Sequence, residues 1–453
     1  MATNSVSSTS VGLDVPALVE QLMSTERRPI DTLNAKISTS QTKISTFGAV
    51  KGLASDFQVA LQTLNTSLQG YSATPTDTSI VSATADSSAT AGTYSLNITT
   101  LAQAHKLAAA GQASDTAPIS TSASTVTFSV GATTADVPIP ANASLQDIRT
   151  AINAANLGVT ATIINDGSGT PYRLALSADA SGTSNAINSI TVQAGGDAAI
   201  NDLLAYNPTS NAPTPAIPMA QTLAAKDAAF QLNGIQITKS SNAVTDVIQG
   251  VTLNLSKIGT VDVTVARDTA AVSKAASGFV DTYNALASKL KSLTAYGASA
   301  GALAGDGTLR MMQDQLRGIL NTPATGGTLS TLSEVGIGFQ ADGTLKLDST
   351  KLSNAMAANF SDVTNLFSSA GGFATRLEAW ATGIVQPTGL IDRHTENLNT
   401  TISSYNEQIR TLEVKMTALQ KQYTKTYTDL NTMLMSMNST STYLAQQFAS
   451  GGN

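Results

Sequence analysis

The chain has 453 residues, a formal net charge of −6 and no cysteine, and only 12% of its residues are charged and 5% aromatic. This length is enough for about two to four domains, each with its own apolar core. The negative charge and the lack of basic runs argue against a nucleic-acid partner. The absence of cysteine excludes disulfides and thiolate zinc sites, and so few titratable groups disfavour an enzyme.

The first residues carry no recognisable targeting segment. The opening MATNSVSSTSVGLDVP has neither a basic region nor an apolar stretch, so we expect no cleaved signal peptide. No apolar run reaches about 18 residues, so we expect no membrane insertion. If the protein works outside the cell, it must leave by a route that recognises an uncleaved, polar N-terminus.

Two helices are predicted near the N-terminus. Val15, Leu18 and Leu22 form a short apolar stripe, and Asp14 is placed to cap its first turn. Pro29 ends this stripe or begins a new first turn. A longer helix is predicted to follow, because apolar residues recur in steps close to three and four: Leu33, Ile37, Ile44, Phe47, Ala54, Phe57, Leu61, Leu64 and Leu68.

A long helix is also predicted at the other end, because residues 390–450 contain no glycine and no proline. At about 1.5 Å per residue it would reach roughly 90 Å. Its alternating apolar steps predict a self-assembly seam: Leu398, Ile402, Tyr405, Ile409, Leu412, Met416, Leu419 and Tyr423. Two steps of four, ending at Tyr427, indicate a stutter that locally unwinds a supercoil. The N-terminal helix, other copies of the chain, or both must cover this seam.

Residues 430–453 carry no charged side chain but hold several large apolar ones. Such a tail is typical of a segment that becomes ordered on assembly or when a chaperone binds it. The residues that we expect to face a partner are Leu434, Met437, Tyr443, Leu444 and Phe448. The alternative is that the tail packs back on its own domain.

The middle of the chain has a different pattern. Residues 71–268 alternate between apolar and polar side chains with Ser, Thr and Gly punctuation, which predicts β-strands. Four prolines within residues 207–218 indicate an extended linker or long loop. Helical patterns then return around a hairpin: helices over 279–293, 309–320 and 348–367, and the hairpin over 335–347.

An internal repeat lies within the β-rich region. Residues 127–163 and 230–265 both predict the order strand, strand, short helix, strand. The two copies align Asp147 with Asp246, and Ser144 with Asp147 has the spacing of a capping box. We expect both aspartates to cap helices and assign them no catalytic role.

These elements predict a multidomain α+β fold. The N- and C-terminal helices are expected to pair as a coiled coil or helical bundle, with β-rich domains inserted between them. We expect five parts: an N-terminal flexible or coiled-coil leg (1–32), a discontinuous helical bundle (33–70 with 269–395), a discontinuous β-rich domain (71–120 with 226–268), an inserted β-rich domain (121–225), and a C-terminal coiled-coil leg and tail (396–453).

No group of residues predicts a catalytic, cofactor or metal site. His105 and His394 are the only histidines and lie in different predicted parts, so a metal cluster or a catalytic pair is not easily assembled. The glycine-containing runs at 166–169 and 336–338 lack a full dinucleotide or phosphate-binding pattern and indicate turns. Trp380 has the spacing of a core anchor. We therefore expect no enzyme and no cofactor.

Several short runs near the two ends of the chain are specific. They are GLDV, LVEQLM and RPI at residues 12–15, 18–23 and 28–30, and MSMNSTSTYL at residues 435–444. Together they resemble the flagellar filament cap family, also called hook-associated protein 2, and the similarity covers nearly the whole chain. Residues 233–253 also resemble a module shared with flagellins.

The resemblance implies a non-catalytic structural protein at the distal tip of the bacterial flagellar filament, extracellular and exported through the flagellar type III channel. In the family, several copies form a ring-like cap with helical legs and a β-rich plate, beneath which flagellin folds and inserts. The implied partners are further copies, flagellin, filament-junction proteins and a cytoplasmic export chaperone at the tail. A surface adhesin or glycan-binding flagellar protein and a hook–filament junction protein remain alternatives.

Overall fold

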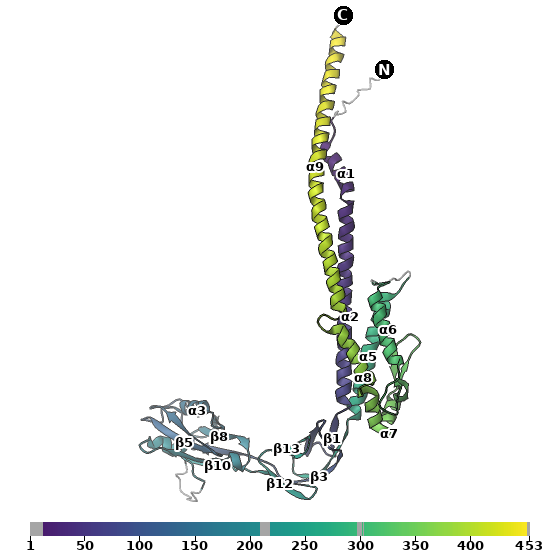
Figure 1. The fold of residues 1–453 in the computed structure, drawn as a ribbon. Helices are drawn as coiled ribbons and strands as arrows, with labels where there is room; N and C mark the ends of the chain where they lie inside the picture. Colours follow the sequence, from purple (N-terminus) through teal and green to yellow (C-terminus); the bar gives the residue numbers. More distant parts are fainter. Residues whose placement is uncertain (1–11, 209–217, 297–300, 302, 451–453) are drawn as a thin grey trace, which may run out of the picture. The chain divides into compact units, whose positions relative to one another are not determined.

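The computed structural model describes residues 12–208, 218–296, 301 and 303–450. The chain forms two compact units, a helical unit of Met1–Leu68 with Val272–Asn453 and a β unit of Gln69–Ala271. The first and the last described helices both belong to the helical unit (Figure 1). The predicted α+β fold with β-rich material inserted between terminal helices is confirmed.

The helical unit contains the predicted helices and the predicted hairpin. The four prolines between residues 207 and 218 fall largely outside the described residues, so that linker is not tested. The elements of the helical unit are α1 (Val15–Glu26), α2 (Arg28–Ser67), α5 (Thr269–Thr294), α6 (Gly307–Asn321), η2 (Leu332–Val335), β16 (Ile337–Phe339), β17 (Leu345–Leu347), α7 (Ser349–Ser368), α8 (Phe373–Val385) and α9 (Leu390–Ser450).

Local signals set the bounds of the terminal helices. Asp14 Oδ1 accepts a hydrogen bond from Ala17 N at 3.1 Å, which confirms Asp14 as the cap of α1. Pro29 lies in the first turn of α2, where a missing N–H costs nothing, so α2 begins ahead of the predicted Leu33. At the other end, α9 fills the whole stretch that lacks glycine and proline.

One apolar core, the bundle core, holds α2 against α5–α9. Phe57 is fully buried, and its ring centroid lies 5.8 Å from that of Phe279, 6.2 Å from Tyr283 and 6.4 Å from Trp380. Trp380 Nε1 donates to Gln315 Oε1 at 3.1 Å. The prediction that Trp380 anchors a core is confirmed, because its ring is buried while its one polar atom has a partner.

One part of the β unit, the flanking β part, comes from both ends of the unit and packs two antiparallel sheets around one apolar core. The five-stranded sheet has the order β1-β15-β3-β11-β12, and the three-stranded sheet has the order β13-β14-β2. The strands are β1 (Tyr71–Pro75), β2 (Val81–Ala85), β3 (Gly92–Thr100), β11 (Ala228–Leu232), β12 (Ile235–Lys239), β13 (Ala243–Ile248), β14 (Val251–Leu255) and β15 (Gly259–Arg267).

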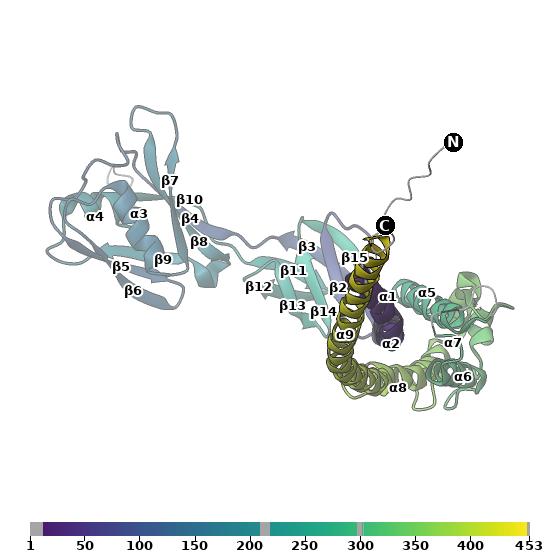
Figure 2. The ribbon, with the colours of Figure 1, turned by 90° about the horizontal axis from the view of Figure 1, so that it is seen from above.

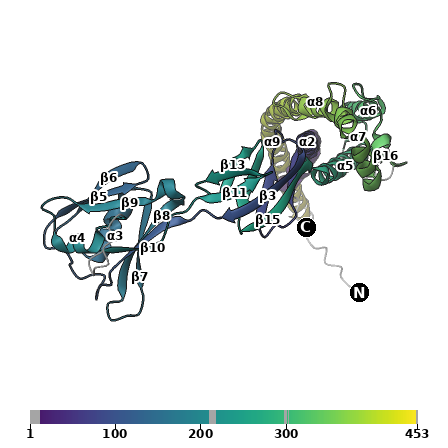
Figure 3. The ribbon, with the colours of Figure 1, turned by 90° about the horizontal axis from the view of Figure 1, so that it is seen from below.

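The middle of the β unit, the inserted β part, has its own core and its own sheets, β10-β4-β8-β7 and β6-β5-β9 (Figures 2 and 3). Its elements are β4 (Ala104–Ala109), β5 (Ser124–Val130), β6 (Thr133–Ile139), α3 (Leu145–Ala154), β7 (Val159–Asn165), β8 (Tyr172–Ser181), η1 (Thr183–Asn185), β9 (Ile187–Val192), α4 (Ala198–Leu204) and β10 (Met219–Leu223). The domain boundaries given above remain predictions, although β4 lies ahead of the predicted boundary at 120/121.

The first copy of the repeat is confirmed as strand, strand, helix, strand. It corresponds to β5, β6, α3 and β7, and Ser144 and Asp147 form the predicted capping box at the start of α3. Leu145, Ile148 and Ile152 are buried on one face of this helix. The local capping signal and the apolar period therefore agree with the tertiary structure.

The second copy differs from the prediction, because residues 243–248 form strand β13 and not a helix. Ala243 occupies the place of the capping Ser144, so no side chain begins a helix there. The branched residues of this segment pair with β14 across a turn at Gly250, whose φ is +68°. Asp246 therefore caps nothing; its carboxylate pairs with Lys239 Nζ on β12 at 2.6 Å.

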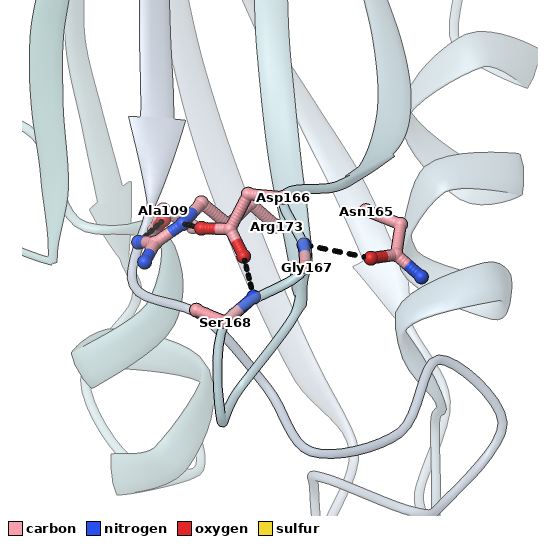
Figure 4. A network of polar contacts seen from close by, with 6 residues as sticks. All are labelled: Ala109, Asn165, Asp166, Gly167, Ser168 and Arg173. Atoms are coloured by element: carbon pink, nitrogen blue, oxygen red, sulfur yellow. Dashed lines mark hydrogen bonds and ion pairs between the residues drawn. The ribbon is translucent and has the colours of Figure 1, made fainter.

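The glycine run at residues 166–169 connects β7 to β8, as predicted for a turn (Figure 4). Asp166 Oδ2 accepts from Arg173 Nε at 2.5 Å, and Asp166 Oδ1 accepts from Ser168 N at 2.9 Å. The bond from Arg173, then those from Ser168, hold the pKa of Asp166 well below its usual range. These contacts close the turn.

Asp197 ties a loop to the start of α4 in the inserted β part. Its side chain is buried and accepts from Thr121 N at 2.6 Å, Ser122 N at 3.0 Å and Ala199 N at 2.8 Å. The backbone bond from Thr121 is the largest cause that holds the pKa of Asp197 well below its usual range. The ionised carboxylate therefore stabilises the fold above about pH 4, and this contribution declines as the pH falls further.

We expect Asp197→Asn to lower the thermal unfolding temperature at pH 7, because an amide N–H would face the donors of Thr121 and Ser122. Thermal melts across pH should show the difference from the parent protein shrinking toward about pH 3. Asp202→Asn, at an exposed position on the same helix, is the control. A difference that is constant with pH would contradict the assignment.

Candidate assembly site

Helices α1 and α2 cover one face of α9, which runs beside both of them (Figure 1). The seam cluster at this contact is formed by buried Val15, Val19, Met23, Ile30 and Met416, and these half-buried residues pack on it: Ile409, Leu412, Leu419, Tyr423 and Tyr427. The predicted stripe on α1 was partly wrong, because Val19 and Met23 are buried while Leu18 and Leu22 are only half-buried. Steps of four keep Val15, Val19 and Met23 on one face of the helix.

The remaining seam residues lie closer to the bundle core. Leu398 packs against that core, and Ile402 is half-buried. Tyr405 is also half-buried, and Lys36 Nζ of α2 lies 5.7 Å from its ring centroid. The structure thus brings five of the eight predicted seam residues together in the seam cluster within a single chain. A role of the seam between copies remains a prediction.

The stutter in α9 lies opposite the break between α1 and α2. Tyr423 and Tyr427 have ring centroids 6.5 Å apart, and Tyr423 Oη donates to Glu26 Oε1 at 3.4 Å. Glu26 is the last residue of α1, and Arg27 separates it from α2. The Glu26 carboxylate is the main cause that raises the pKa of Tyr423.

A groove of about 770 Å³ opens beside α1 and α9. Apart from Pro16, its apolar lining comes from α1 residues of the seam cluster, and its polar rim includes Glu20, Arg27 and Gln420. A groove of this kind beside two packed helices can accept a further apolar helix or chain segment.

The tail of α9 continues past the start of α1. Leu13 N donates to Asn431 Oδ1 at 2.9 Å. Beyond this point Leu434 is half-buried, and the other predicted tail residues are exposed by 47% to 80%: Met437, Tyr443, Leu444 and Phe448. These exposures speak against the alternative in which the tail packs back on its own domain. An apolar helical surface of this kind is typical of a segment that binds a partner.

The described residues offer no group of three or more His, Asp or Glu side chains that could hold a metal ion. His105 is buried, and its Nδ1 accepts from Ile187 N at 3.0 Å. His394 packs against Phe47, with its Nε2 3.6 Å from Asp306 Oδ2. Both histidines therefore have packing roles. Among the described helices, none is long and apolar enough to cross a membrane.

Three family models match the chain. Residues 11–105 match the flagellar hook-associated protein 2 N-terminus and residues 225–439 its C-terminus. Residues 125–180 match the flagellin hook IN motif, and this range covers the first copy of the repeat. The resemblance to flagellins noted from the sequence lay instead in the second copy, at residues 233–253. The flagellar hook-associated protein 2 of Escherichia coli strain K12 is 32% identical over 99% of both chains. The chain belongs to the flagellar hook-associated protein 2 family.

Other members agree with this assignment. The hook-associated protein 2 of Salmonella typhimurium is 34% identical over 68% of this chain and 67% of its own, and the A-type protein of Pseudomonas aeruginosa is 29% identical over 97% and 96%. Among solved structures, the D1-D2-D3 domains of the flagellar cap protein FliD from Escherichia coli match with a TM-score of 0.66 and 33% identity. That match covers 78% of this chain and 99% of the crystallised one.

Proposed function

We propose that this protein caps the distal tip of the bacterial flagellar filament and promotes the folding and insertion of flagellin. The single observation that carries the proposal is the match to a hook-associated protein 2 over 99% of both chains. The role is structural, with no covalent step. The packing roles of both histidines fit such a role.

The groove beside α1 and α9 and the exposed tail of α9 support finer features of this proposal. Several copies assemble into a ring-like cap, and the groove beside α1 and α9 is available to a neighbouring copy or to flagellin. Filament-junction proteins are further partners. The exposed tail is bound by a cytoplasmic export chaperone before export, and the protein then works outside the cell at the filament tip. The exposed apolar residues of the tail support this assignment.

The two alternatives are not favoured. A hook–filament junction protein and a surface adhesin would each leave the full-length match to hook-associated protein 2 unexplained. A strain that lacks the gene distinguishes them. We expect such a strain to secrete monomeric flagellin and to carry no filament; attached filaments of normal length would overturn the capping function.

The tail supplies a separate prediction. We expect removal of residues 430–453 to reduce both chaperone binding and filament growth, because most of the exposed large apolar residues of α9 lie there. Pull-down of the chaperone and electron microscopy of filaments measure the two effects. A full-length variant with serine at the five predicted tail residues should show the same two losses. The control variant, Ser439→Ala with Ser441→Ala, should bind the chaperone and grow filaments like the parent protein. Unchanged secretion with long attached filaments would contradict the assignment.

A further inference from the structure

Polar contacts join the two β parts, whose apolar cores are separate. Buried apolar residues form one cluster in the flanking β part and another in the inserted β part. The chain crosses between the parts at residues 101–103 and again at 224–227. The two crossings pair: Gln103 N donates to Lys226 O at 2.9 Å, and Lys226 N donates to Gln103 O at 3.2 Å.

A third segment, at the end of β8, adds contacts from the inserted part. Thr183 donates through its N and its Oγ1 to the two carboxylate oxygens of Asp227, at 2.7 and 2.6 Å. Ser181 Oγ donates to Ser240 O at 2.7 Å, in the loop between β12 and β13. The two bonds from Thr183 to one carboxylate thus tie this segment to the second crossing.

Gly182 lies between these contacts and allows a close approach of the two backbones. Its φ is +94°, and a Cβ at this position would lie 2.5 Å from Ser240 Cβ and 2.6 Å from Ser240 Cα. A side chain of any kind is therefore excluded by both sterics and backbone conformation. Asn242, in the β12–β13 loop beside Ser240, contacts the first crossing at Ala102. Its Oδ1 accepts from Ala102 N at 2.8 Å, and its Nδ2 donates to Ala102 O at 3.0 Å.

We propose that Gly182, Asp227, Ser240 and Asn242 are positioning residues that lock the two β parts into one rigid arm. Two crossings alone would leave a joint free to bend, because no apolar core formed by the described residues spans it. The third segment and the β12–β13 loop add contacts that restrain it further. This inference concerns the joint itself; its effect at the filament tip rests on the proposed function.

The cysteine-free chain permits a direct test. Ile164→Cys in the inserted part and Ile258→Cys in the flanking part, 52% and 57% exposed, accept a pair of spin labels. Pulsed electron–electron double resonance on the full chain should give a narrow distribution of distances between the two labels. With Gly182→Ala we expect a distribution about twofold broader, or more, because the close approach is lost.

The matched control is Gly195→Ala, in the same β part but outside the β7–β8 hairpin that carries the label, with a φ of +85° and no atom near its Cβ position. It imposes a similar backbone strain without affecting the joint, so its distribution should stay narrow. Asp227→Ala, which removes both bonds to Thr183, should also broaden the distance distribution. This variant tests the proposal if Gly182→Ala does not fold. A parent distribution that is already broad, or narrow distributions in both joint variants, would overturn the proposal. Filament growth is scored separately, so failure of the cap function does not affect this result.

Discussion

Replacing Ile409, Leu412 and Met416 by serine is expected to abolish filament growth while leaving both β parts folded. Met416 is only 4% exposed, and Ile409 and Leu412 pack on the same seam cluster. Loss of a buried Met, Leu or Ile side chain costs about 2–5 kcal/mol, somewhat less where the residue is half-buried. Helix α1 is too short to persist without this contact, so it should detach from α9. Electron microscopy of filaments and hydrogen exchange over residues 15–26 measure the two consequences.

The matched control for the seam is Val414→Ser. Val414 lies in the same stretch of α9 but is 70% exposed, so its replacement should change neither hydrogen exchange in α1 nor filament length. Far-UV circular dichroism of the triple variant should retain the strand signal, because the β unit has separate cores. Long attached filaments in the triple variant would show that filament growth does not need the seam cluster.

Phe57→Ala is expected to destabilise the helical unit by about 3–5 kcal/mol, the range for removal of a fully buried phenylalanine. Its ring contacts Phe279, Tyr283 and Trp380 in the bundle core, so a cavity would form where α2, α5 and α8 meet. At about 2–4 °C per kcal/mol for a unit of this size, the unfolding temperature should fall by roughly 10 °C. Thermal melts followed at the helical band measure this.

Val59→Ala is the control for that experiment, because Val59 lies on the same helix and is 57% exposed. A surface substitution of this kind stays within about 0.5 kcal/mol. The strand signal should unfold at the parent temperature in both variants. Equal effects of the two substitutions would mean that Phe57 is not a central residue of the bundle core.

The sequence by itself determined the elements whose signals are local. The absence of glycine and proline set the extent of α9, and Asp14 set the start of α1. Ser144 with Asp147 marked the start of α3. Capping, chain breaking and apolar period depend on residues a few positions apart, so they are visible without the rest of the molecule. The terminal runs supplied the family in the same way.

The tertiary structure decided the features that depend on distant partners. Residues 243–248 became a strand because Ala243 cannot cap a helix and β14 offered a pairing edge. Val19 and Met23, and not Leu18 and Leu22, faced Met416, since the direction of α9 selects the buried face of α1. The close approach of Gly182 to Ser240 joins residues far apart in the chain. The spacing of apolar residues shows that one face of a helix will be buried. Only the packed chain determines which element covers that face.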